Sequence, residues 1–170
     1  MGQAVLIPIE EYLASHYDPD RDYVDGALVE RNVGEKDHSK QQARLTAFFF
    51  ARRKTGNLNV FPEQRIQVSP KRFRVPDVCV TLGPEPDEQV FTRPPFLCIE
   101  ILSPSDTMHS MQERIDDYLS FGVPFVWVID PQNRRGWVYT LDGAREARDG
   151  FMRTANPELV VPLAELFDND

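Results

Sequence analysis

Two short apolar runs that each contain a carboxylate place the strongest constraint on how this chain folds. The runs are Val75–Leu82 and Phe96–Leu102, both rich in β-branched and aromatic residues, and a Pro-, Gly- and acid-rich connection separates them. This pattern predicts two strands joined by a long loop. Asp77 lies in the first run and Glu100 in the second. Because a buried carboxylate is costly unless it is paired, hydrogen-bonded or bound to a cation, both side chains must have partners.

The spacing also predicts how the two strands pair. Side chains alternate between faces along a strand, so Asp77 shares a face with Cys79, and Glu100 shares one with Cys98. If the strands run antiparallel with the two carboxylates opposite each other, the two cysteines also face each other. Neighbouring carboxylates repel, and a divalent cation is the simplest remedy. The alternative is a structural pair satisfied by backbone N–H groups or arginine.

The rest of the chain predicts an α/β fold, in which helices flank a mixed β-sheet. A chain of 170 residues is expected to form a single domain, 1–170. Apolar spacing predicts helices over residues 7–17, 37–54, 105–121 and 163–167. Further strands are expected over residues 22–24, 27–33, 58–69, 125–129 and 136–141. The continuous apolar run at 125–129 is typical of a strand buried on both faces.

Composition excludes several classes of protein. The chain is 41% hydrophobic and 27% charged, which is ordinary for a globular protein. No apolar run is long enough for a membrane span, the N-terminus lacks a signal-peptide pattern, and two cysteines do not make a disulfide framework. We therefore expect a cytoplasmic protein without a membrane partner.

The charge is unevenly distributed along the chain. The net charge is −8, which argues against a general binder of polyanions, yet residues 31–80 hold eleven Lys or Arg and four acidic residues. That segment is +7 and leaves −15 for the remainder, so a local basic face is available for nucleic acid. The basic residues expected to contact nucleic acid are Lys36, Lys40, Arg44, Lys71, Arg72 and Arg74.

Four motifs stand out along the chain: R-V-P-D at 74–77, I-E-I-L-S-P-S at 99–105, D-G-A-L-V-E at 25–30 and G-V-P-F-V-W-V-I-D-P at 122–131. Together they resemble the Uma-two family of restriction-type endonucleases, within the PD-(D/E)XK nuclease superfamily. The resemblance extends from about residue 8 to 167. It implies a restriction-endonuclease-like fold and a metal-dependent endonuclease that hydrolyses DNA.

The resemblance also implies a metal site. Asp77, Glu100 and the backbone carbonyl of Ile101 are expected to hold Mg²⁺ or Mn²⁺, which such sites use to activate water and stabilise the leaving oxygen. The superfamily's lysine, two residues after the glutamate, is replaced by Leu102. Relatives of the Uma-two type place a lysine on the following helix instead, and this position is Arg114. Arginine keeps the positive charge but does not act as a general base.

Other site residues are expected from the same resemblance. His38 is a catalytic candidate near a helix start, where the helix dipole favours the neutral imidazole, and a surface or capping role is the alternative. Three accessory candidates follow from the resemblance: Tyr118, Glu30 and Gln64. Tyr118 lies one turn after Arg114 on the same helical face. Glu30 and Gln64 are also compatible with ordinary strand positions.

Two further interpretations are open. The absence of the expected lysine favours a catalytically degenerate module that binds nucleic acid or a protein partner without cleaving. The other is a homodimeric protein whose nuclease fold serves a structural use. Small nucleases often act as dimers so that two sites meet two strands, and a homodimer is expected here.

Overall fold

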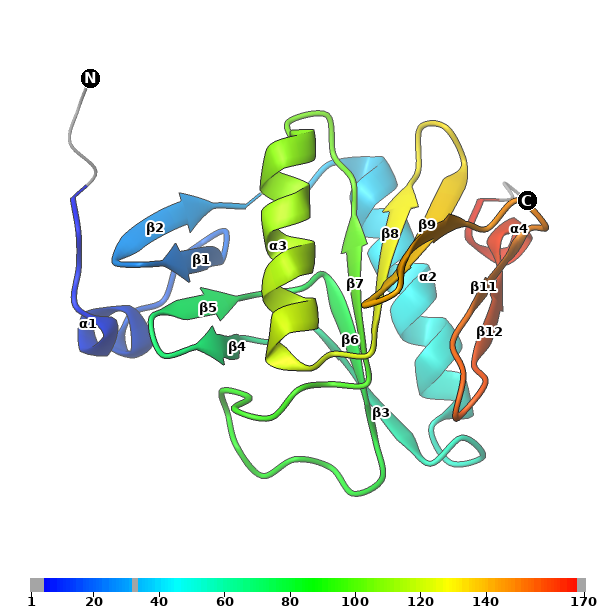
Figure 1. Cartoon of the computed structure of the whole chain (residues 1–170), viewed down its shortest axis with the longest axis horizontal. Helices are drawn as coiled ribbons and strands as arrows, with labels where there is room; N and C mark the ends of the chain where they lie inside the picture. Colours follow the sequence, from blue (N-terminus) through cyan, green and yellow to red (C-terminus); the bar gives the residue numbers. More distant parts are fainter. Residues whose placement is uncertain (1–4, 32–33, 168–170) are drawn as a thin grey trace.

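A six-stranded mixed sheet forms the centre of the protein (Figure 1). The computed structural model describes residues 5–31 and 34–167. In the order across the sheet, the strands are β10 (Gly143–Glu146), β9 (Arg135–Thr140), β8 (Phe125–Asp130), β7 (Leu97–Ile101), β6 (Val78–Leu82) and β3 (Leu58–Pro62). Only the β7–β8 pair is parallel. This pair requires a crossover, which α3 (Met108–Phe121) supplies.

Two helices cover opposite faces of this sheet. Alternate residues of β6 and β7 face α2 (Lys36–Arg52) on one side and α3 on the other. Val80 and Ile99 pack in the cluster that includes α2, whereas Cys79 and Cys98 pack in the cluster that includes α3. Both faces are therefore apolar and buried, and Glu100, which shares the face of Cys98, points toward α3.

A second, smaller sheet lies on the other side of α3 from the central sheet in the view of Figure 1, and its strand β4 contacts that helix. Its order is β2 (Ala27–Glu30), β1 (Arg21–Val24), β5 (Arg72–Arg74) and β4 (Ile66–Ser69), and α1 (Ile9–Ala14) precedes it. The β1–β2 hairpin turns at Asp25-Gly26, where both residues have positive φ (51° and 97°). Two positive φ angles fit a type I′ turn, which suits the Asp-Gly sequence.

The C-terminal part adds a short hairpin and a helix. β11 (Phe151–Arg153) pairs with β12 (Val160–Pro162), and α4 (Leu163–Phe167) follows directly. Leu166 and Phe167 join the core cluster that contains α2. None of the helices within the described residues combines the length and apolar character needed to cross a membrane.

The predicted α/β fold is confirmed, and so is the central strand register. Cys79 lies opposite Cys98 in the antiparallel β6–β7 pair. Two predicted strands are shorter than expected. The run 58–69 is divided because Glu63 adopts φ 52°, which breaks the extended backbone. The run 75–82 begins as a strand only at Val78, because Pro76 has no backbone N–H for a ladder.

Candidate active site

Asp77 lies at the entrance of β6 and is only 3% exposed. Its Oδ2 accepts a hydrogen bond from the backbone N–H of Ile101 (2.7 Å) and lies 3.2 Å from Nε2 of His38. Its Oδ1 lies 2.6 Å from Nη2 of Arg31. The backbone carbonyl of Asp77 accepts a bond from the side chain of Gln42 (3.0 Å), so α2 holds both ends of this residue.

Glu100, on β7, has no exposed surface. Its Oε2 lies 3.0 Å from Nη1 of Arg114, and its Oε1 accepts a hydrogen bond of 2.7 Å from the hydroxyl of Tyr118. Both partners come from α3 and lie one turn apart. Arg114 also pairs through Nη2 with Asp106, just before the helix. The Glu100 carboxylate therefore has a cation on one oxygen and a neutral donor on the other.

The two carboxylates differ in how their surroundings affect their pKa values. Burial acts to raise the pKa of Asp77, but the hydrogen bond from His38 and the charge of Arg31 outweigh it and lower that pKa. Burial raises the pKa of Glu100 to about 7 despite the opposing charge of Arg114, and the negative charge of Asp77 adds to the rise. Asp77 is thus the carboxylate held ionised by its partners.

His38 lies at the start of α2 and is buried. Burial acts to lower the pKa of His38, but the hydrogen bond to Asp77 and the charge of that carboxylate outweigh burial, so the pKa is raised. The sequence led us to expect that the helix dipole favours the neutral imidazole. The structure corrects this, because a carboxylate 3.2 Å away has a larger effect than the dipole.

A pocket of about 230 Å³ opens directly onto Asp77. Arg31, His38 and Arg114 also line it, whereas Glu100 lies beneath Arg114 and does not reach the pocket surface. Three further acidic side chains, Asp18, Asp20 and Glu63, also line it. The pocket therefore brings two guanidinium groups together with several carboxylates.

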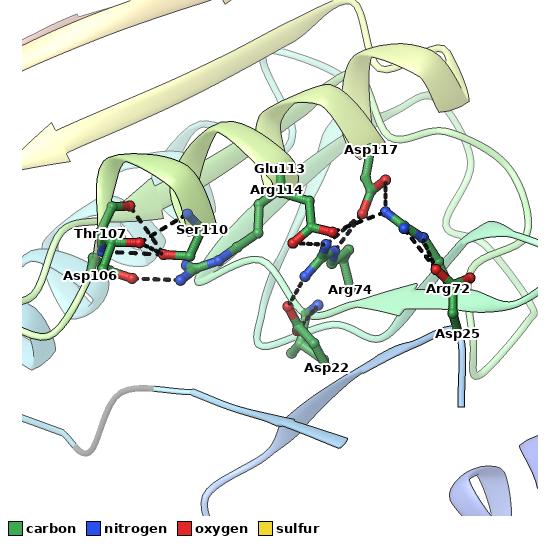
Figure 2. A network of polar contacts seen from close by, with 11 residues as sticks. Asp22, Asp25, Arg72, Arg74, Asp106, Thr107, Ser110, Glu113, Arg114 and Asp117 are labelled. Atoms are coloured by element: carbon green, nitrogen blue, oxygen red, sulfur yellow. Dashed lines mark hydrogen bonds and ion pairs between the residues drawn. The ribbon is translucent and has the colours of Figure 1, made fainter. Parts of the chain in front are cut away.

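A network of ion pairs, buried around Arg74 and more exposed around Arg72, fixes α3 against the smaller sheet (Figure 2). Arg74 of β5 lies between Asp22 of β1 (3.0 Å) and Asp117 of α3 (2.6 Å). Arg72 adds pairs to Asp25 (2.7 Å) and Asp117 (3.0 Å). Because Asp117 lies directly before Tyr118, these contacts set the position of the helix that carries both partners of Glu100.

The helix itself begins at a reciprocal cap that also appears in Figure 2. The hydroxyl of Thr107 accepts from the N–H of Ser110 (3.0 Å), and Oγ of Ser110 accepts from the N–H of Thr107 (3.2 Å). Such a capping box satisfies two N–H groups that a helix start otherwise leaves unpaired. At the other end, Gly122 adopts φ 109°, the left-handed conformation that closes many helices.

The oxygen ligands at this site fit a hard divalent cation in kind. Two buried carboxylates and the carbonyl of Ile101 are of the type that Mg²⁺ and Mn²⁺ take. Among residues 5–31 and 34–167, no group of three or more His, Cys, Asp or Glu side chains is arranged to hold a metal. The fit therefore depends on Asp77, Glu100 and backbone oxygen, and every carboxylate oxygen already has a protein donor.

Comparison with known proteins identifies the family. The family model described as Uma2, putative restriction endonuclease, matches residues 9–166. The chain belongs to the Uma2 family. A crystal structure described as that of a putative nuclease belonging to DUF820 from Anabaena variabilis is similar in fold, with a TM-score of 0.81 and 23% sequence identity over 95% of this chain and 97% of that chain. No curated protein matches the chain.

In this Uma2 protein, six of the predicted site residues come together. Asp77 contacts both His38 and Ile101, and Arg114 and Tyr118 both contact Glu100. The two groups are adjacent, because Ile101 follows Glu100 in β7.

Two accessory candidates lie outside this cluster. The side chain of Glu30 is 79% exposed and lies 3.3 Å from Arg21, whereas the next residue, Arg31, enters the pocket. Gln64 donates to the backbone carbonyls of Arg65 and Gln89, so its side-chain amide stabilises the local backbone.

The basic residues predicted to bind nucleic acid fall into different environments. Arg74 is 2% exposed and enclosed by carboxylates, so the expectation that it contacts nucleic acid is wrong. Arg72 is ion-paired, and Arg44 donates to the carbonyl of Leu166. Lys36 and Lys71 are exposed, and half-buried Lys40 lies one turn after Lys36 on α2.

Sequence reasoning did not identify Arg31 or Gln42 as site residues. Period-2 alternation indicates that only one of Glu30 and Arg31 faces inward, but it does not say which one. Gln42 lies one turn after His38 on α2, and this i, i+4 spacing was the available signal.

Proposed function

We propose that this Uma2 protein is a divalent-metal-dependent endonuclease that hydrolyses phosphodiester bonds in DNA. The observation that supports the proposal best is the junction of Asp77 and Glu100. Two carboxylates from adjacent strands, buried next to each other at a pocket that contains two arginines, are costly to maintain for structure alone. Restriction-type nucleases generally use divalent metals, and this pair offers the ligands.

Each side chain has a chemical task in this proposal. Asp77, Glu100 and the carbonyl of Ile101 would hold Mg²⁺ or Mn²⁺, which supplies Lewis-acid stabilisation and an acidified water when bound. Arg114 fixes Glu100 and places positive charge near the phosphate, although it does not accept a proton. His38, through Nε2, orients Asp77. Tyr118 holds the second oxygen of Glu100.

Substrate approach fits the lysines at the start of α2 better than the arginines. Lys36 is exposed and Lys40 is half-buried, and both lie near His38 on this helix. Long side chains there can reach phosphates beside the pocket, while sequence-independent attraction supplies most of the affinity. In a homodimer, two such sites would face two strands.

A catalytically degenerate binding module is the second candidate. Leu102 in the place of the superfamily's lysine favours it, and so does the full set of protein donors on both carboxylates. Such a module would bind DNA but would neither bind metal at Asp77 nor cut.

Cleavage of supercoiled plasmid with Mn²⁺ or Mg²⁺ tests the proposal. The variants are Asp77→Asn, which keeps the shape of the side chain, and Arg114→Lys, which restores a lysine. The matched control is Asp142→Asn, an exposed carboxylate on the β9–β10 turn outside the pocket. We expect nicking by the wild type and by the control, and its loss in Asp77→Asn.

Two other results favour the binding module. If the wild type is inert while Arg114→Lys cuts, the site is intact but silenced at residue 114. If none of the proteins cuts and Asp77→Asn binds DNA as the wild type does, the endonuclease proposal is wrong.

A further inference from the structure

Arg31 occupies the one carboxylate oxygen of Asp77 that faces away from the protein backbone. Oδ2 accepts from Ile101 and His38, whereas Arg31, at 2.6 Å, is the partner that the described residues give to Oδ1. Both Arg31 and Asp77 line the pocket. The ion pair therefore lies at the boundary between the protein interior and the space that a substrate enters.

A divalent cation at Asp77 would compete with this guanidinium for the same oxygen. Ligand oxygens lie about 2.0–2.1 Å from Mg²⁺. An arginine whose Nη2 is 2.6 Å from that oxygen occupies one of its lone pairs, and its positive charge would repel a cation bound to the other. Moving Arg31 off Oδ1 relieves this repulsion.

Arg31 has fewer carboxylate partners than Arg114 among the described residues. Arg114 pairs with Glu100 through one nitrogen and with Asp106 through another, whereas Arg31 pairs with Asp77. A guanidinium released into this pocket, which Asp18, Asp20 and Glu63 also line, can pair with a phosphate of the substrate through two parallel N–H···O bonds.

We propose that Arg31 is a counter-ion of Asp77 that a divalent cation displaces, and that the displaced guanidinium then binds the phosphate of the DNA backbone. This inference rests on the proposed function. It makes Arg31 a substrate-binding residue whose availability depends on metal, so DNA is held tightly only when the site is loaded.

Mn²⁺ binding, measured by the loss of the free-ion electron paramagnetic resonance signal, tests the first half. The variants are Arg31→Gln, Arg31→Lys and Asp77→Asn. The control is Arg135→Gln, whose arginine pairs with Glu146 at 2.7 Å outside the pocket. We expect Arg31→Gln to bind Mn²⁺ about tenfold or more tightly than the wild type, the range that coupling between close charge pairs implies. The Mn²⁺ affinity of Arg31→Lys should lie between those of Arg31→Gln and the wild type.

A labelled DNA duplex, followed by fluorescence anisotropy with Ca²⁺ in place of Mn²⁺, tests the second half. Ca²⁺ should strengthen binding by the wild type and by Arg135→Gln. Arg31→Gln should lose that gain although it binds metal better. This opposite effect on metal and on DNA is not produced by a merely unfolded variant, and circular dichroism of each variant checks folding.

The outcomes separate this inference from the proposed function. If the wild type and Asp77→Asn bind Mn²⁺ equally, the metal site itself is wrong. If Asp77→Asn loses Mn²⁺ but Arg31→Gln binds it no better than the wild type, the metal site stands and the displacement of Arg31 is refuted. Unchanged DNA binding by Arg31→Gln in Ca²⁺ refutes the phosphate role.

Discussion

The buried ion pair between Asp22 and Arg74 provides the sharpest test of how the smaller sheet is joined to α3. Replacing Asp22 by Asn removes the charge that lies 3.0 Å from Arg74 but keeps the shape of the side chain. The amide oxygen can still accept from the backbone N–H of Val75, the 3.0 Å bond that Asp22 Oδ1 makes. The substitution therefore isolates the ionic contact.

The expected cost follows from burial. The side chains of Arg74 and Asp22 are 2% and 3% exposed, and removing one partner of such a pair costs about 3–5 kcal/mol. Asp117 still pairs with Arg74 at 2.6 Å, so we expect the lower end, about 3 kcal/mol. For a chain of this size, that corresponds to a fall in Tm of about 6–12 °C.

Asp25→Asn is the matched control. Asp25 lies in the same hairpin and pairs with Arg72 at 2.7 Å, but its side chain is 55% exposed. Exposed pairs contribute about 0–1 kcal/mol, and Asn tolerates the positive φ of this turn position. Urea unfolding followed by tryptophan fluorescence gives the free energy of unfolding of each variant. If Asp22→Asn unfolds within 1 kcal/mol of Asp25→Asn, the reasoning from burial is refuted.

Two more predictions concern α3 and the central strands. Thr107→Ala removes one half of the capping box and should lower the free energy of unfolding by about 1 kcal/mol in urea; an unchanged value would mean that the cap does not hold the helix start. Cys79 and Cys98 are fully buried, and burial raises the pKa of both thiols, so neither should react with a thiol reagent at pH 8 until urea is added, when two should react. Rapid labelling of the folded chain would contradict the packing of β6 against β7.

The sequence predicted those parts of the fold that local patterns encode. The apolar runs, helix caps and Asp-Gly turn each depend on neighbouring residues, so they identified the strands around Cys79 and Cys98, the two long helices and the β1–β2 hairpin. The positive φ of Glu63 was not predictable in this way, because only a few per cent of non-glycine residues adopt it.

The partners of the site residues were harder to predict than the residues themselves. Burial of Asp77 and Glu100 required counter-charges, and the sequence offered eleven basic residues in the segment 31–80 alone. Arg31 and Asp77 are 46 positions apart, and Arg74 and Asp117 are 43 apart. Pairing over such distances is fixed by the way two sheets meet a helix, which no local pattern specifies. This is why Arg74 was assigned to the nucleic-acid surface although it is buried.

Arginine is the cation in the buried pairs Arg31–Asp77, Arg74–Asp22 and Arg114–Glu100, and its use there has a common physical reason. Arginine stays charged under every condition that leaves the protein folded, and its planar group satisfies several oxygens at once. A lysine at position 114 would lose its proton more readily when buried, leaving Glu100 uncompensated whenever the metal is absent. With arginine there, Glu100 always has a cation, so the core next to β7 tolerates the carboxylate in the metal-free state. The cost is chemical, because a guanidinium does not take a proton from water. In the proposed endonuclease, the nucleophile would therefore depend on the bound cation, and the proposed competition between that cation and Arg31 would decide whether the chain cuts or only binds.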